Sequence, residues 1–179
     1  VSSNELQTWN FLLQNPFDFA ANILNRFSIP WRGSIILIPQ NKHYSWTKSA
    51  KFFGLGATDL WPIEIDEEGH LSIPSLEANI LRAKKENRGI LLTVSVAGTT
   101  ELGGLDPIHK VDLHLKKEQA SGIHIWHHID AAYGGFLKTI DYKQPNALSP
   151  YAIDALDSLG KADSITLDPH KLGYVPYAS

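Results

Sequence analysis

Cysteine is absent from the sequence, which excludes both a disulfide framework and a thiolate metal site. This absence is compatible with a reducing compartment, and we expect a cytoplasmic protein. Long apolar runs are missing as well. The longest one, Ile35 to Ile38, is far too short to cross a bilayer, so we expect no membrane partner.

An excess of basic residues is also missing. The chain has 16 Lys and Arg against 19 Asp and Glu, a formal charge of −3, and no basic run is dense enough to follow a phosphate backbone. We therefore expect no nucleic-acid partner. Methionine is absent even at position 1, and we expect the chain to be a piece of a longer polypeptide.

What is present is the composition of a globular protein, with 43% of the 179 residues hydrophobic and 20% charged. Apolar residues at helical spacing open the chain, from Leu6 to Leu13 and from Pro16 to Phe27. Further along, short β-rich runs alternate with helical patterns. We expect strands at 34–38, 60–65, 89–96, 123–129 and 164–167, and helices at 45–55, 74–87, 107–121 and after 150.

Apolar strands that alternate with helices predict an α/β fold, with a mostly parallel sheet and helices on both faces. We divide the chain into a helical lead-in at 1–33 and an incomplete larger domain at 34–179. Parallel sheets bind ligands at the carboxyl ends of their strands. The loops at 97–106, 130–135 and 168–171 each follow such an end, so we expect them to share one rim.

The last of these loops, Asp168-Pro169-His170-Lys171, brings a lysine directly to the end of an apolar strand that we expect to be buried. A lysine at the mouth of a cleft can form a Schiff base with a carbonyl. The alternative is an ordinary surface lysine, and the strand pattern alone does not decide between the two.

Asp130 directly follows the strand expected at 123–129 and precedes Ala131-Ala132 and Gly134-Gly135. A buried carboxylate needs a cation, and a protonated pyridine nitrogen would serve. The small residues would then let a flat ring lie against the backbone. An N-cap aspartate before a Gly-rich turn is an equally good interpretation of this stretch.

Three histidines close to Asp130 raise the question of a metal site. Strand alternation opposes one, because His124 and His128 share a face with Asp130 whereas His127 points the other way. All four residues also lie in one strand instead of converging from several elements. We therefore expect no metal.

Four motifs in this order resemble one family, although His43 or Thr99-Thr100 alone can be capping or turn residues. The motifs are H-Y-S at 43–45, A-G-T-T and G-G-L-D-P-I within 97–108, H-I-D-A-A-Y-G-G at 128–135 and S-I-T-L-D-P-H-K at 164–171. They are similar to those of the pyridoxal-phosphate-dependent group II amino acid decarboxylases, which include glutamate, aromatic amino acid and tyrosine decarboxylases. K-H-Y-S-W at 42–46 and L-G-Y-V-P-Y at 172–177 most resemble the bacterial tyrosine decarboxylases.

The resemblance implies part of the large domain of a fold-type-I, aspartate aminotransferase-like enzyme that uses pyridoxal 5'-phosphate (PLP). It implies that Lys171 is the Schiff-base lysine and that Asp130 keeps the pyridine nitrogen protonated. His43 would stack on one side of the ring, and Ala132 would lie against the other. The protonated ring is the electron sink of the reaction.

Further roles follow from the same resemblance. Thr100, with Thr99 beside it, would lie near the ring hydroxyl and the substrate carboxylate, and His170 near the phosphate. The chain shows no Ser-Gly-Gly-Thr-like phosphate turn before the opening helices, which fit an insertion of the family less specifically. The mobile loop that protonates the substrate Cα is expected beyond residue 179.

The implied reaction is decarboxylation of an L-amino acid, with an aromatic one, tyrosine, expected first. Tyr44, Trp46 and Tyr174 can build an apolar slot or belong to the core, and a glutamate site would need a cation such as Lys42 or Lys48. Family active sites form at a dimer interface, which implies a homodimer. The alternatives are another PLP-dependent carbon–carbon lyase, a glutamate-type decarboxylase, and a non-catalytic binding module with the same fold.

Overall fold

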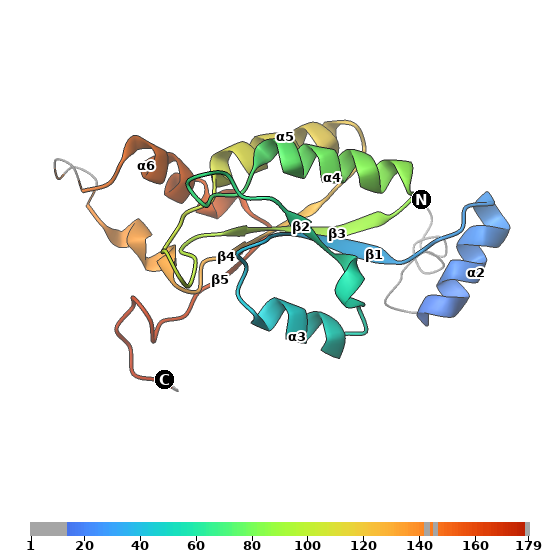
Figure 1. The fold of residues 1–179 in the computed structure, drawn as a ribbon, viewed down its shortest axis with the longest axis horizontal. Helices are drawn as coiled ribbons and strands as arrows, with labels where there is room; N and C mark the ends of the chain where they lie inside the picture. The colour runs from blue at the N-terminus through green and yellow to red at the C-terminus, as the bar shows by residue number, and fades with distance from the viewer. Residues whose placement is uncertain (1–13, 142–143, 145–146, 178–179) are drawn as a thin grey trace.

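The computed structural model describes residues 14–141, 144 and 147–177, drawn in colour in Figure 1. The helix expected from Leu6 to Leu13 lies outside the described residues. Within them, no helix is both long and apolar enough to cross a membrane.

Five parallel strands form one sheet in the order β2-β1-β3-β4-β5. This sheet confirms the predicted α/β class and four of the five strands within two residues at each end. β4 starts later than the expected strand at 123, because the backbone N–H of Ile123 still donates to Glu118 at the end of the preceding helix. The strands are β1 (Ser34–Pro39), β2 (Leu60–Ile63), β3 (Gly89–Val96), β4 (Trp126–Asp130) and β5 (Ser164–Thr166).

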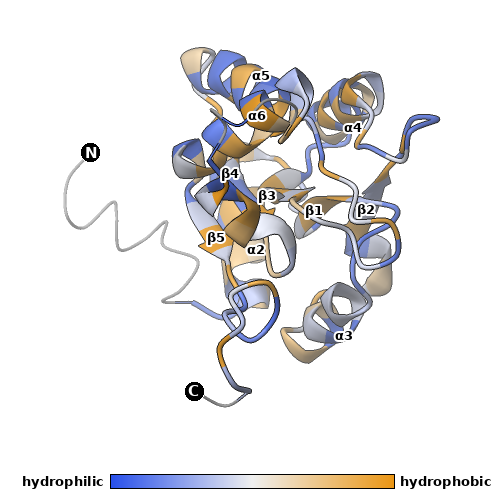
Figure 2. Cartoon of the chain, turned by 90° about the vertical axis from the view of Figure 1, so that its left-hand side faces the viewer, coloured by the Kyte–Doolittle hydropathy of each residue, from blue (hydrophilic) through white to orange (hydrophobic). Residues whose placement is uncertain are grey.

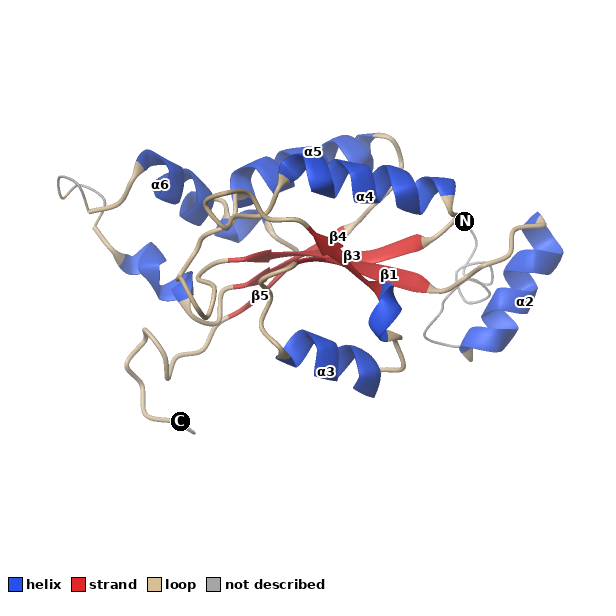
Figure 3. Cartoon of the chain, viewed as in Figure 1, coloured by secondary structure: helices blue, strands red, loops and turns tan. Residues whose placement is uncertain are grey.

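Helices cover both faces of the sheet, as Figures 1 and 3 show. Among the described helices, α3 lies on one face and α4, α5 and α6 lie on the other. A further helix, α2, lies beyond the amino end of β1, and none of its residues is buried. The α-helices are α2 (Pro16–Phe27), α3 (Ser45–Phe52), α4 (Ile73–Lys85), α5 (Ile108–Ala120) and α6 (Pro150–Asp157), and the 3-10 helices are η2 (Ala57–Asp59), η3 (Gly134–Thr139) and η4 (Leu159–Lys161).

Two of these helices begin at a serine followed by a proline within the first turn. The Ser72 hydroxyl accepts the backbone N–H of Ser75 at the start of α4, and Ser149 does the same for Ala152 in α6. A serine cap satisfies one of the free N–H groups at a helix start, and proline fits the first turn because its missing N–H has no partner there. These local signals fix where the chain turns from loop to helix.

The continuous apolar run of β1 is explained by burial on both faces. Ile35 and Leu37 belong to the core under α4 and α5, whereas Ile36 and Ile38 pack with Ala50 on the side of α3. Figure 2 shows hydrophobic residues on the central strands and both kinds of residue on the helices that cover them. Parallel strands that are covered on both faces are rich in apolar residues for this reason.

The last strand corrects an expectation. We expected a buried strand at 164–167, but β5 is the edge strand of the described sheet and pairs only with β4. Ile165 is 41% exposed and Leu167 is 46% exposed. Its apolar sequence therefore covers one side of the sheet edge without being enclosed by the residues described.

The order of the strands creates a switch point between β1 and β3. From β1 the chain crosses to β2 through α3 on one face, and from β3 it crosses to β4 through α5 on the other. The loops after β1 and β3 therefore leave the sheet in opposite directions. Open α/β sheets bind ligands in the crevice that this divergence opens at the carboxyl ends of the strands.

Candidate active site

A cavity of about 420 Å³ lies at this switch point. Its walls come from the loop after β1, the first turns of α3, the loop after β3, the end of β4 and the segment after β5. Six of the seven residues predicted for the site line it: His43, Thr99, Thr100, Asp130, Ala132 and Lys171. The three loops that we expected to share a rim do contribute to one cavity.

Asp130 is the last residue of β4, and its carboxylate is held from the side of α3. The indole Nε1 of Trp46 donates to Oδ2 of Asp130 at 2.9 Å, and the backbone N–H of Ala132 makes a longer contact of 3.4 Å with Oδ1. The first of these bonds joins residues 84 positions apart in the sequence. The carboxylate therefore has a fixed orientation at the cavity wall.

His128 lies two residues earlier on the same strand and also faces the cavity. Its ring nitrogens lie 2.8 Å from Ser164 Oγ and 3.2 Å from Thr166 Oγ1, both on β5. The edge of its ring meets Trp46, with ring centroids 5.5 Å apart. Burial lowers the pKa of His128, while the nearby Asp130 acts in the opposite direction.

Lys171 reaches the cavity from a turn that follows β5. The backbone N–H of Lys171 donates to the carbonyl of Asp168 at 3.0 Å, and this turn brings the two side chains together. Lys171 Nζ lies 2.7 Å from Asp168 Oδ2. Both side chains line the cavity, so its amine and two carboxylates, those of Asp130 and Asp168, share one space.

The same turn directs His170 away from the cavity. Its ring contacts Tyr177, with centroids 4.5 Å apart, and its Nε2 lies 3.9 Å from Asp168 Oδ2. Neighbouring residues in a tight turn point in different directions, which is why Lys171 lines the cavity and His170 does not. A role of His170 in phosphate binding stays a prediction.

His43 lies on the loop between β1 and α3 and lines the cavity. Its Nδ1 is 2.8 Å from the Ser45 hydroxyl and also accepts the Ser45 backbone N–H at 3.3 Å, so the imidazole is bonded to the first residue of α3. Its ring lies against Tyr44 at 4.3 Å, and Tyr44 is itself 66% exposed. His43 thus lines the cavity with its ring held by Ser45.

The glycines after β4 do something other than expected. We expected Gly134-Gly135 to let a ring approach the backbone, but neither lines the cavity. A Cβ on Gly134 would lie 2.5 Å from the Ala97 carbonyl oxygen, and one on Gly135 would lie 2.1 Å from Leu167 Cδ2. Gly134 is small because the loops after β3 and β4 pack directly on each other, and Gly135 is small because the Leu167 side chain after β5 packs against it. Ala132 is the small residue at the cavity.

The histidines near Asp130 are directed to separate partners. His127 is buried on the other face, 2.9 Å from Ser95 Oγ, and burial lowers its pKa to about 4. His124 precedes β4 and lies 4.0 Å from Asp163, so the expected shared face of His124, His128 and Asp130 holds only for the last two. This arrangement does not converge on a metal.

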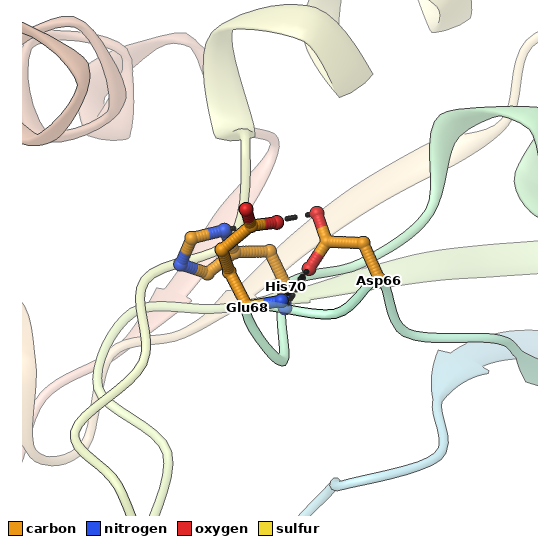
Figure 4. Close-up of side chains that lie close together, drawn as sticks. All are labelled: Asp66, Glu68 and His70. Atoms are coloured by element: carbon orange, nitrogen blue, oxygen red, sulfur yellow. Dashed lines mark hydrogen bonds and ion pairs between the residues drawn. The ribbon is translucent and has the colours of Figure 1, made fainter.

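A different group of possible ligands lies on the acidic turn after β2: Asp66, Glu68 and His70 (Figure 4). The turn's own bonds explain it, since Asp66 Oδ1 accepts the backbone N–H groups of Glu68 and His70 at 3.1 and 2.8 Å. The His70 ring stacks on Tyr151 at 4.9 Å. These side chains stabilise the loop and lie outside the cavity.

Several cavity residues were not predicted for the site, among them Asn41, Ser49, His128, Tyr133, Thr166 and Asp168. Helical spacing could have predicted Ser49, because Ser45 and Ser49 lie one turn apart on α3 and therefore face the same side. Trp46 was expected at most as part of an apolar slot. Its hydrogen bond to Asp130 depends on how α3 packs across the sheet, which the sequence pattern does not reveal.

The comparison with protein families identifies the chain. The model of the pyridoxal-dependent decarboxylase conserved domain matches residues 34–178, and the chain belongs to this family. It is 36% identical over 166 residues to the L-tyrosine decarboxylase of Levilactobacillus brevis, with 80% of this chain and 26% of that protein covered. It is 33% identical over 145 residues to the L-2,4-diaminobutyrate decarboxylase of Rhizobium meliloti, covering 81% of this chain and 26% of the relative.

Solved structures agree with the fold. A crystal structure of mouse CSAD in apo form matches 90% of this chain and 31% of its own, with a TM-score of 0.66 and 28% identity. The relatives act on different amino acids, as their names state. The chain spans about a quarter of the length of the relatives named above.

Proposed function

We propose that the chain forms part of a PLP-dependent enzyme that decarboxylates an L-amino acid. The observation that carries this proposal is that Asp130, at the end of β4, and Lys171, on the turn after β5, line one cavity at the switch point of the sheet. A primary amine and a carboxylate in one cavity are the two groups that a pyridine aldehyde needs, one for its carbonyl and one for its ring nitrogen.

The donor set fits the ring of PLP. Asp130 offers a carboxylate with its orientation fixed by Trp46, and Lys171 offers an amine 37% exposed at the side chain. Ala132 leaves room at the cavity wall, and the His43 imidazole also lines the cavity, where it can stack on the pyridine ring. We propose that parts of the protein outside the described residues contribute to binding the phosphate group.

When bound, PLP supplies an electron sink that stabilises the carbanion left by loss of carbon dioxide. In our proposal Asp130 holds a proton on the ring nitrogen, and Lys171 provides the nucleophilic amine. His43 and Ala132 fix the plane of the ring, which determines the bond that is cleaved. The Thr99 hydroxyl already accepts the backbone N–H of Gly104 within the loop, at 2.8 Å. We therefore propose that the Thr100 hydroxyl is the one that contacts the ligand.

We propose tyrosine as the first substrate to test. The cavity includes the aromatic side chains of Trp46 and Tyr133, whereas Tyr44 and Tyr174 do not line it. A distal carboxylate would need a cation. Among the described residues that line the cavity, the only lysine or arginine is Lys171; Lys48 instead lies over the Tyr44 ring at 4.7 Å.

We also propose that the protein works as a cytoplasmic homodimer, and that residues 34–179 belong to its large domain while 1–33 form a helical lead-in. The support is the resemblance of the motifs and, for the larger domain, the extent of the family match. Light scattering of the full-length protein tests the dimer. A monomer with full activity would contradict it.

Release of carbon dioxide by the full-length protein tests the proposed reaction. We expect PLP-dependent release from tyrosine, with kcat/KM higher for tyrosine than for dihydroxyphenylalanine, tryptophan, 2,4-diaminobutyrate and glutamate. A preference for glutamate or diaminobutyrate would overturn the aromatic assignment and leave the reaction intact. Conversion of amino acids without release of carbon dioxide would favour another PLP-dependent lyase, and PLP binding without turnover would favour a binding module.

A further inference from the structure

We propose that Trp46 is a positioning residue for Asp130, an inference that rests on the proposed function. The indole N–H fixes the rotation of the carboxylate that is to hold the ring nitrogen of PLP. Nothing in the sequence motifs assigns this task to a tryptophan. It follows from one hydrogen bond, between Nε1 of Trp46 and Oδ2 of Asp130 at 2.9 Å.

The indole is itself held in place from two sides. Trp46 is the second residue of α3, and its ring packs against the buried cluster that includes Ile36 and Ile38. Its other contact is the edge of the His128 ring at 5.5 Å and an interplanar angle of 66°. His128 is anchored in turn by two hydroxyls of β5. A ring confined in this way can direct its single N–H donor at one acceptor.

Asp130 has little else to hold it. Within the described part of the chain, no other side chain donates a hydrogen bond to this carboxylate, and none forms an ion pair with it. The contact from the Ala132 N–H is long, at 3.4 Å. Without Trp46 the carboxylate is free to rotate about its last torsion angle, which has a broad, nearly two-fold energy profile. If the Asp130 carboxylate turns away, its interaction with the protonated ring nitrogen of PLP weakens, because that interaction depends on a preorganised geometry.

The test uses the full-length holoenzyme with Trp46→Phe, Asp130→Asn and the double variant. Phenylalanine keeps an aromatic ring against His128 but removes the donor. We expect kcat with the preferred amino acid to fall about tenfold, equivalent to about 1.4 kcal/mol, while KM stays within about twofold. The pH at which the visible absorbance of bound PLP changes should also shift. In the Asp130→Asn background, Trp46→Phe should change kcat by less than about twofold.

Trp61→Phe is the matched control. Trp61 is also a buried tryptophan in this domain, but it lies on β2 under Arg82, whose guanidinium is 4.0 Å from its ring, and it does not line the cavity. It should lower the Tm without changing kcat or the absorbance of PLP. Benzothienylalanine at position 46 keeps the size of indole and replaces the N–H by sulfur, so it should reproduce the Trp46→Phe effect with an unchanged Tm.

Three results overturn the inference. One is Trp46→Phe with unchanged kcat and absorbance, another is benzothienylalanine behaving as tryptophan, and the third is full additivity with Asp130→Asn. A wild-type protein that binds no PLP overturns the proposed function and the inference together. These failures are distinguishable because the wild type is measured first.

Discussion

The Nζ atom of Lys171 lies 2.7 Å from Oδ2 of Asp168, and both side chains line the cavity. The side chains are 37% and 28% exposed, so water screens the pair and its contribution to stability is small. A weak pair holds the amine near the cavity without trapping it. Such an amine can leave the carboxylate and react with an aldehyde.

Borohydride reduction of the full-length protein with PLP should therefore attach the cofactor to Lys171. We expect Lys171→Ala to abolish both the labelling and the turnover, because no other cavity amine is present among the described residues. Peptide mapping locates the label. Lys42→Ala, next to the site in sequence but not part of the cavity wall, should leave labelling intact. Label on any other lysine would contradict the assignment.

Asp130→Asn should retain PLP and lose most activity. The amide can still accept the indole N–H of Trp46, but it cannot hold the positive charge of a protonated ring nitrogen. We expect kcat to fall about a hundredfold, or about 3 kcal/mol of transition-state stabilisation. Steady-state kinetics on PLP-saturated enzyme measure it.

A surface aspartate provides the control for this change. Asp157 on α6 pairs with Lys138 and is half exposed, so Asp157→Asn should leave kcat unchanged. Equal kcat for Asp130→Asn and the wild type would remove Asp130 from the mechanism.

The sequence predicted the elements well because each had its own local signal. Serine and proline marked the starts of α4 and α6, and β1 needed apolar residues on both faces. Parallel strands share the direction of their ends, so the polar loops at those ends were expected to meet. They do, in the cavity that Thr100, Asp130 and Lys171 line.

Side-chain direction was not predictable to the same degree. His170 and Lys171 are adjacent, yet only the lysine lines the cavity, because the turn after Asp168 sets where each points. The bond from Trp46 to Asp130 joins residues 84 positions apart and depends on the packing of α3. The exposure of β5 was missed because an apolar edge strand and a central one have the same pattern.

Gly134→Ala should destabilise the protein and disturb the cavity. The new Cβ would lie 2.5 Å from the carbonyl oxygen of Ala97, and the Gly134 N–H now donates to that oxygen at 2.8 Å. The loops after β3 and β4 must separate, which we expect to cost about 1–3 kcal/mol. Thermal unfolding measures the loss, and a raised KM for PLP should accompany it since both loops line the site.

Gly160→Ala is the matched control, because no atom lies within 4 Å of the added Cβ. It should leave the stability unchanged or raise it by up to about 1 kcal/mol. If Gly134→Ala were equally harmless, the close approach of the two loops would not matter to the fold.

His127 should make the stability depend on pH. Burial lowers its pKa from 6.5 to about 4, so between these values the unfolded chain binds a proton that the folded protein does not. The stabilisation is fully present above pH 6.5 and is lost as the pH falls through 4, on the order of 3 kcal/mol in all. His127→Gln should flatten this dependence, whereas His124→Gln, with its side chain 55% exposed, should not.

Asp106 should act in the opposite direction over an overlapping range. Burial raises its pKa from 3.8 to about 6, although the carboxylate accepts the N–H groups of Leu71 and Val96. The folded protein therefore holds a proton that the unfolded chain has released, and the stability from this group is present below pH 3.8 and lost as the pH rises through 6.

Asp106→Asn should therefore make the unfolding free energy rise more steeply between pH 4 and 6, where the wild type has two opposing contributions. At pH 4 the variant should also be less stable by about 1–3 kcal/mol, because an amide has one acceptor oxygen and cannot satisfy both N–H donors, and this deficit should shrink as the pH rises through 6. Urea unfolding at pH 4, 5, 6 and 7 separates the two effects, since one changes the slope and the other the offset. An unchanged slope in Asp106→Asn would show that the pKa of this carboxyl is not raised. An unchanged slope in His127→Gln would show that the pKa of His127 is not lowered.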